Sequence, residues 1–256
     1  MRAHRCLLGK ARCLISRRAN LAVPLVVDEL SGGKLEMPSL NGLVSKLDTF
    51  AYPLSRRIGI SDRSLLFGCD TTTLANLPYV LRNGQEFCML RQDQCGSLRE
   101  CNPEFQLADF QSLDGTRFRC YTVRKDGRTV AYAWLGSGDI PALHNCNGHE
   151  WTGLPIYLDQ ETAYLFSVYV TSSSRGQRLY QVLASGIAST ILGDGIRRIV
   201  LTTDIRNSSS IKAVQRMGFE LYGRTSFSAF SGWKRARYEV GASFLPSKLG
   251  KYVGDC

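Results

Sequence analysis

The stretch that decides the fold is Val168-Tyr-Val-Thr-Ser-Ser-Ser-Arg-Gly-Gln-Arg-Leu-Tyr180, in which a strand runs into a polar loop that opens directly into a helix. A turn of this kind points consecutive backbone N–H groups, and the positive end of the helix dipole, at one place. Arg175 and Arg178 add positive charge that suits a pyrophosphate or a ribose phosphate. The stretch therefore predicts a phosphate site, with a plain surface connection as the alternative.

The sequence around this turn alternates between strand and helix patterns. In chain order it predicts a strand at 163–170, a helix at 178–192, a strand at 198–203, a helix at 209–217 and strands at 221–230 and 234–240. Upstream, the strand-like runs 117–124 and 128–135 flank Asp126-Gly127, which is a strong signal for a hairpin turn. This order predicts an α/β domain, a mixed sheet with helices packed on it.

A further helix is predicted before the hairpin. Leu74, Leu77, Val80 and Leu81 are spaced as one helix face, and Thr71–Thr73 supply candidate caps. Residues 28–62 contain too many Gly and Pro residues for a long element and read as a connector. We therefore expect a basic extension and connector over 1–62, one domain over 63–245 and a tail over 246–256.

Charge and hydropathy exclude several classes of protein. The 256 residues carry a formal net charge of +10, but residues 1–27 hold six basic and no acidic side chains, so the body is only mildly basic. No nucleic-acid partner is therefore expected of the body, although the basic arm could dock on nucleic acid or an anionic membrane. There is no apolar run of eighteen residues or more, so no membrane span is predicted.

The cysteines and the first residues bear on location. Nine cysteines at irregular intervals, without a C-x-x-C motif, fit free thiols in a reducing compartment, so we expect a cytoplasmic protein. Ser16-Arg17-Arg18 before a short apolar stretch is faintly similar to a twin-arginine signal, and the Arg-rich start is similar to an organelle transit peptide. A flexible arm and a docked helix are the other interpretations of this segment.

Two segments, taken together, resemble the GNAT superfamily of acyl-CoA-dependent N-acyltransferases. The first family signature runs Val-x-Pro-x-x-Arg-Gly-x-Gly-x-Gly/Ala between a strand and a helix, and Val170, Arg175, Gly176 and the apolar Leu179 match it. Ser172 replaces the Pro, Arg178 the first small residue and Tyr180 the last. The second signature is Asn-x-x-Ala/Ser before a helix that ends in Gly-Phe, and Asn207, Ser210, Gly218 and Phe219 match it. The resemblance covers about residues 63–240.

The resemblance implies a GNAT-like fold, with a mostly antiparallel sheet, and acetyl-CoA or another acyl-CoA as co-substrate. It implies that the backbone of Val168 and Val170 bonds the pantetheine arm, which lies in the sheet as an extra strand. The amides of Arg175, Gly176, Gln177, Arg178, Leu179 and Tyr180 would cradle the pyrophosphate. Asn207 and Ser210 would bond the pantetheine or lie near the thioester. Since small residues normally let the backbone approach the phosphate, Arg178 must swing outward or supply a salt bridge.

The implied reaction is N-acyl transfer to a primary amine on a small molecule or a protein, and a homodimer is left open. The family often keeps a Glu on the strand before the phosphate loop and a Tyr seven residues after the Asn. Tyr164 and Val214 stand there in this sequence, so the catalytic residues are unknown; Glu161, Asp204 and Tyr222 are the nearby candidates. The missing groups also leave open a non-catalytic acyl-CoA-binding domain, and the charge of residues 1–27 leaves open an interaction protein that docks through its basic arm.

No metal site is predicted. His144, Cys146 and His149 place three ligand types within six residues, but structural zinc wants four ligands, so a polar loop is expected that lines the acceptor pocket. Lys234-Arg235-Ala-Arg237 is expected to be a solvated edge strand that discourages pairing with other chains.

Overall fold

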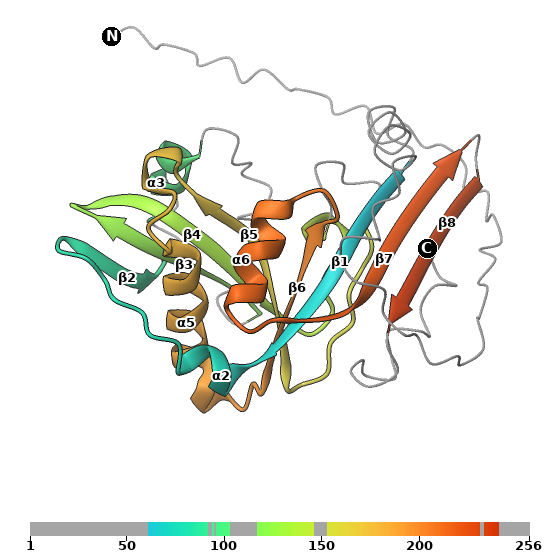
Figure 1. Ribbon diagram of the computed structural model, residues 1–256, viewed down its shortest axis with the longest axis horizontal. Coiled ribbons are helices and arrows are strands. Elements are labelled where there is room, and N and C mark those ends of the chain that lie inside the picture. Colours follow the sequence, from blue (N-terminus) through green and yellow to red (C-terminus); the bar gives the residue numbers. More distant parts are fainter. Residues whose placement is uncertain are drawn as a thin grey trace, which may run out of the picture.

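The computed structural model describes residues 61–91, 94, 96–102, 117–145, 153–230 and 233–240. Its strands are β1 Ser61–Asp70, β2 Gln85–Met89, β3 Phe118–Lys125, β4 Arg128–Ser137, β5 Thr162–Val170, β6 Arg198–Asp204, β7 Glu220–Phe230 and β8 Trp233–Val240. Its helices are α2 Thr71–Ala75, α3 Gly96–Cys101, α5 Leu179–Ile191 and α6 Ser208–Arg216. Short 3-10 turns lie at η3 Ala142–His144, η5 Ser172–Ser174 and η6 Leu192–Asp194. Figure 1 shows the sheet running from β2 at one side to β8 at the other.

The strands form one sheet in the order β2-β3-β4-β5-β6-β1-β7-β8. Every neighbouring pair is antiparallel except β5 and β6, which run parallel because α5 crosses over between them. The predicted mixed, mostly antiparallel α/β sheet with flanking helices is thus confirmed.

Strand β1 lies inside the sheet, between β6 and β7. Ser64 pairs with Asp204 of β6 on one side and with Thr225 of β7 on the other. The sequence analysis predicted no strand over 61–70. Its polar start and its unbroken Leu65-Leu66-Phe67 run hide the alternation, because β1 is buried on both faces of the sheet.

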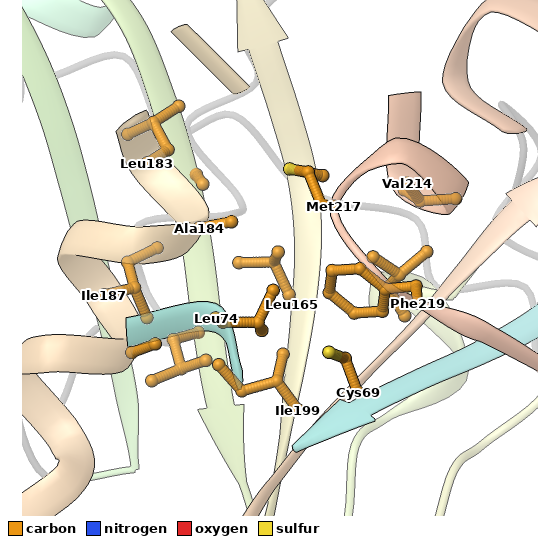
Figure 2. Close-up of a cluster of buried hydrophobic side chains, with 14 of the residues drawn as sticks. Cys69, Leu74, Leu165, Leu183, Ala184, Ile187, Ile199, Val214, Met217 and Phe219 are labelled. Atoms are coloured by element: carbon orange, nitrogen blue, oxygen red, sulfur yellow. The ribbon is translucent and has the colours of Figure 1, made fainter. Parts of the chain in front are cut away.

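One face of the sheet, called here the helical face, is covered by α2, α5 and α6. Their apolar side chains pack on alternate residues of the strands, such as Phe67 of β1, Leu165 of β5 and Ile199 of β6, all nearly inaccessible to solvent. Figure 2 shows Leu183, Ala184 and Ile187 of α5 over the sheet, with Val214, Met217 and Phe219 closing the cluster from the α6 side. The apolar side chains whose periodicity predicted α5 form a large part of this core.

The opposite face of the sheet carries a second core. It collects the alternate residues of the same strands, and these are packed by α3 and by the segments beside η3. Its largest buried side chains are Trp134, Tyr164 and Phe166. Because both faces are covered, the central strands contribute side chains to two separate cores.

The predicted elements from the hairpin onward are confirmed, each within two residues of its predicted ends. The β3–β4 turn has Asp126 at φ 50° and Gly127 at φ 77°, the pair of positive φ angles that a two-residue I′ turn requires. β8 lies at an edge of the described sheet, as expected for Lys234-Arg235-Ala-Arg237. Residues 1–60 and 241–256, including the basic arm and the tail, lie outside the described residues.

The helix predicted from Leu74 to Leu81 is wrong in length. α2 ends at Ala75, and Val80 is 79% exposed. Pro78 explains the early stop, because it restricts Leu77 to extended backbone and cannot donate a helical hydrogen bond. Leu74 is fully buried, and Leu77 and Leu81 still pack on the helical face.

The described residues add two observations on membranes and thiols. None of their helices combines the length and the apolar character that a membrane crossing needs. Cys69, Cys88, Cys101 and Cys120 all have free thiols.

Gly68 of β1 offers a test of the packing across this sheet. A Cβ at Gly68 would overlap the ring of Tyr222, whereas a Cβ at Gly96 of α3 would meet nothing. We expect Gly68→Ala to lower stability by about 1–3 kcal/mol and the thermal midpoint by roughly 3–10 °C. Gly96→Ala, the matched control, should leave the midpoint unchanged or raise it slightly; equal midpoints for the two variants would contradict the packing.

His144 gives the protein a pH-dependent contact. Its ring lies 5.0 Å from that of Phe118 and 4.9 Å from that of Phe166, and burial, with Arg117 adding, lowers its pKa. The unfolded chain then binds the proton more readily, so this contribution is complete above about pH 6.5 and is lost as the pH falls. The thermal midpoint should therefore fall less between pH 7 and 5.5 in His144→Phe than in the wild type; parallel curves would refute this.

Candidate functional site

The centre of the candidate site is the place where β5 and β6 separate. Their parallel ladder has three pairs and ends at Tyr164 and Val200, while β5 continues to Val170 and β6 to Asp204. The last six residues of β5 therefore have no partner strand on the β6 side. That edge is where the resemblance expects Val168 and Val170 to bond a ligand, and both side chains pack toward the helical face.

A β-bulge accounts for the separation. Between the pairs Tyr132–Tyr169 and Trp134–Phe166 the register of β4 and β5 shifts, and Ser167 takes a positive φ of 46°. A bulge bends its strand and increases the local twist. β5 thus follows β4 but turns away from β6.

The loop after β5 leads into an uncapped helix. At the start of the loop, Thr171 N donates a hydrogen bond to Val130 O, and the short turn η5 follows. Near its end, Gly176 and Arg178 have positive φ angles of 78° and 59°. The first helical bond of α5 runs from Val182 N to Arg178 O, and no side chain caps this end. The N–H groups of the first turn therefore point forward without acceptors, at the end of a thirteen-residue helix.

The charge at this end of α5 suits an anion. No acidic residue lies in the first turn, and Arg175 and Arg178 are exposed. The exposed side chain of Arg178 can take either of the two roles expected for it, an outward position or a salt bridge to a bound phosphate. Its left-handed backbone costs about 1–2 kcal/mol, since this position favours glycine. Leu179 is buried in the core and anchors the turn.

Asn207 proves to be the N-cap of α6. Its Oδ1 accepts hydrogen bonds from Ser210 N at 3.1 Å and from Ser209 Oγ at 2.8 Å. The side-chain amide nitrogen makes no hydrogen bond to the described residues. One end of Asn207 therefore holds the helix, while the other remains a free donor beside the separated strands.

Tyr180 and Ser210 connect the two sequence segments. Tyr180 takes the place of the last small residue of the first signature, and its side chain makes a hydrogen bond to that of Ser210. Burial raises the pKa of Tyr180 well above its ordinary value, and the bond to Ser210 opposes that rise. The contact joins α5 to α6, and both helices pack on the helical face of the sheet.

Two of the three candidate acid–base residues lie away from this place. Glu161 precedes β5, at the end opposite to the phosphate loop, and pairs with Arg197 at 3.5 Å. Tyr222 packs against Gly68, and its pKa is raised by burial, with Arg198 at the start of β6 opposing. Glu161 thus lies at the wrong end of β5, and Tyr222 of β7 is separated from β6 by the whole of β1.

Asp204 is the candidate that lies nearest, at the end of β6. Its Oδ1 accepts from the backbone N–H of Arg206 at 2.7 Å, and the Arg206 guanidinium lies 3.4 Å away. The carboxylate is therefore engaged in the turn that starts α6. Val214, at the position of the family Tyr, is fully buried in the core.

The sequence did not reveal a hydrogen-bonded group on the opposite face. Tyr164 Oη lies 2.6 Å from Thr202 Oγ1, and both hydroxyls lie within hydrogen-bond distance of Asn145 Oδ1. Asn145 Nδ2 in turn donates to Leu154 O at 2.7 Å. The group bridges β5 and β6 at the end of their ladder, from Tyr164 of the last pair to Thr202, two residues beyond Val200. The sequence offered one signal for this group, namely that Tyr164 stands where the family often keeps a Glu. Asn145 gave no signal, because it belongs to the loop after β4 and lies 19 residues before Tyr164 in the chain.

The described residues contain no group of three side chains that could hold a metal ion. His144 is buried between aromatic rings, whereas Cys146 and His149 lie outside the described residues.

The predicted cofactor-binding residues lie at and after the carboxyl ends of β5 and β6. The free strand edge offers amide groups to a pantetheine arm, and the uncapped end of α5 offers N–H groups to a pyrophosphate. The residues present therefore fit acyl-CoA, although Tyr180 must leave room for it between α5 and α6.

Comparison with known proteins gives a family and a fold. The model of the acetyltransferase (GNAT) family matches residues 86–219, just over half of the chain. No curated protein sequence matches.

Solved structures resemble this one at low identity. A conserved protein of unknown function from Staphylococcus epidermidis ATCC 12228 has 9% identity and a TM-score of 0.48, over 72% of this chain and 66% of that chain. The ribosomal-protein-S18-alanine N-acetyltransferase from Escherichia coli has 15% and 0.41, over 53% and 77%. AAC(6')-Iy in complex with the bisubstrate analog CoA-S-monomethyl-acetylneamine has 18% and 0.41, over 53% and 90%. The chain spans less than two thirds of a GCN5-related N-acetyltransferase from Kribbella flavida, 60% of its length.

The family match extends through the separated strands, the uncapped helix and the two signature segments. The protein therefore belongs to the acetyltransferase (GNAT) family.

Proposed function

We propose that this protein is an acyl-CoA-dependent N-acyltransferase that acts on a primary amine, with acetyl-CoA as the first candidate donor. The observation that carries the proposal is the free edge of β5 leading into the uncapped end of α5. Pantetheine would extend the sheet along Val168 and Val170, and the pyrophosphate would lie on the N–H groups from Gly176 to Tyr180. Asn207 would donate its free amide N–H to the pantetheine.

The acceptor amine would approach from the opposite face of the sheet. There the group formed by Tyr164, Thr202 and Asn145 lies beside the point where the strands separate. The amine nitrogen attacks the thioester carbonyl carbon, the C–S bond breaks, and the amine loses a proton while the thiolate gains one. The chain's contribution is mainly to hold amine and thioester in place, and the hydroxyls and ordered water would carry the proton away.

The acceptor class follows from the absent carboxylate at Tyr164. A lysine amine, with a pKa near 10.4, needs a base at pH 7, whereas an α-amine near 7.7–8.0 is partly free already. We therefore propose an α-amine or another weakly basic amine, on a peptide or a small molecule. Two solved structures represent these alternatives. One is of an enzyme that acetylates a ribosomal-protein alanine, and the other holds an acetylneamine analog. A cytoplasmic location is proposed on the free thiols of the described cysteines.

A second candidate function is binding of acyl-CoA without turnover. Val214 fills the position of the family Tyr with a fully buried apolar side chain, and Asp204 is engaged by Arg206. The chain could thus hold the thioester while lacking groups that move protons.

Binding should be measured first, with a variant that separates the two ends of Asn207. Saturating acetyl-CoA, at about 100 times its Kd, should raise the wild-type midpoint by roughly 5–10 °C. Asn207→Asp keeps the cap acceptor but replaces the free amide donor by a negative charge, so its unliganded midpoint should be retained and its acetyl-CoA shift reduced. No wild-type shift with acetyl-CoA, CoA or a longer acyl-CoA would exclude the cofactor site.

Turnover distinguishes the two functions. Release of free CoA thiol should be followed with acetyl-CoA and three amines: a peptide with a free α-amine, the same peptide with a blocked N-terminus and a lysine, and an aminoglycoside. We expect release with an α-amine at pH 7 and a rate that rises as the pH approaches 9, because more of the amine is neutral. Binding of acetyl-CoA without release for any amine would leave the non-catalytic function.

A further inference from the structure

A groove of about 510 Å³ lies between the β3–β4 turn and the loop that precedes α5. Lys125, Asp126 and Arg128 line it from the turn, and Ser173, Ser174 and Gln177 line it from the loop. Gln177 is two residues before α5, so the groove opens directly onto the uncapped helix end. Its position makes it the natural extension of the phosphate site.

The two cations of the groove have no ionic partner among the described residues. Lys125 and Arg128 are exposed and stand directly opposite each other in the β3–β4 register. Like charges at such a pair destabilise a hairpin. Asp126 is the one acidic residue in the lining, so the groove keeps a net positive charge.

The side chain of Ser174 supplies an independent observation. Ser174 is only 6% exposed, lines the groove, and its side chain makes no hydrogen bond in the described structure. Because Ser174 lines the groove beside two cations, its hydroxyl is placed to donate to an acceptor atom of a ligand there. Gln177 is held from the other side, since its Oε1 accepts from Gln85 Nε2 at 3.5 Å.

We propose that this groove holds the 3′-phosphate of the CoA nucleotide, with Lys125 and Arg128 as its cations and Ser174 as a hydrogen-bond donor. The inference rests on the proposed function, which places the pyrophosphate on the end of α5. A phosphate monoester carries close to two negative charges at pH 7 and three strong acceptor oxygens, which match this lining. The groove would thus select CoA esters over esters of 3′-dephospho-CoA and of pantetheine alone.

The test compares acetyl-CoA with acetyl-3′-dephospho-CoA by isothermal titration calorimetry. The wild type should bind acetyl-CoA about tenfold more tightly, as two partly exposed charge-assisted contacts imply. The Lys125→Ala/Arg128→Ala variant should bind both ligands as the wild type binds the dephospho ester. A matched control, Arg197→Ala/Arg235→Ala, removes two exposed cations elsewhere and should keep the tenfold preference.

The thermal midpoint of the variant and the relative affinities for the two esters distinguish the possible outcomes. The midpoint of Lys125→Ala/Arg128→Ala should equal or exceed that of the wild type, because a repulsive pair is removed, so weak binding cannot come from misfolding. Equal wild-type affinity for the two esters, or a preference that survives in the variant, would overturn the groove assignment and leave the proposed function standing. Binding of neither ester would overturn both.

Discussion

The constraint on which the site depends is the short parallel ladder between β5 and β6. Three pairs hold the strands together up to Tyr164 and Val200, and beyond them the bulge at Ser167 turns β5 away. A closed sheet would satisfy these backbone groups within the chain. Here the missing pairs, together with the unused N–H groups of α5, are the polar groups that a ligand can satisfy. This opening lies in a sheet that is covered on both faces, by α5 and α6 on one side and by the aromatic core on the other.

The part of the fold that predicts well from sequence is the part whose pattern is local. The β3–β4 turn needs two positive φ angles, and Asp126-Gly127 supplies them. The helix α5 is predicted by the spacing of its apolar residues, which all face one core: Leu179, Val182, Leu183 and Ile187. The phosphate loop and the Asn207 cap are also contiguous in sequence. By contrast, β1 was not predicted, because a strand buried on both faces shows no alternation of polar and apolar residues. The helix α2 was predicted too long, because the prediction followed the spacing of its apolar residues past Pro78.

The contacts that sequence reasoning missed join residues far apart in the chain. Asn145 meets Tyr164 and Thr202 only because the loop after β4 folds over the opposite face. Tyr180 reaches Ser210 only because α5 and α6 lie together on the helical face. Tertiary packing also separates Glu161 and Tyr222 from the free edge of β5: Glu161 lies at the opposite end of that strand, and Tyr222 lies on β7, beyond β1. Family signatures identify the binding loop, whereas the residues around the reacting atoms depend on tertiary packing.

The position of β1 has a consequence for how the chain reaches this structure. In the described sheet β7 and β8 join the other strands only through β1, which itself lies before the family match. Ser64 must wait for Asp204 and Thr225 to be synthesised before it can pair. Such long-range pairing slows folding and leaves an apolar segment, Leu65 to Phe67, unpaired meanwhile. During translation the earliest strand of the described sheet thus gains its second partner only when β7 has been made, and that interval is when the nascent chain most needs protection from aggregation.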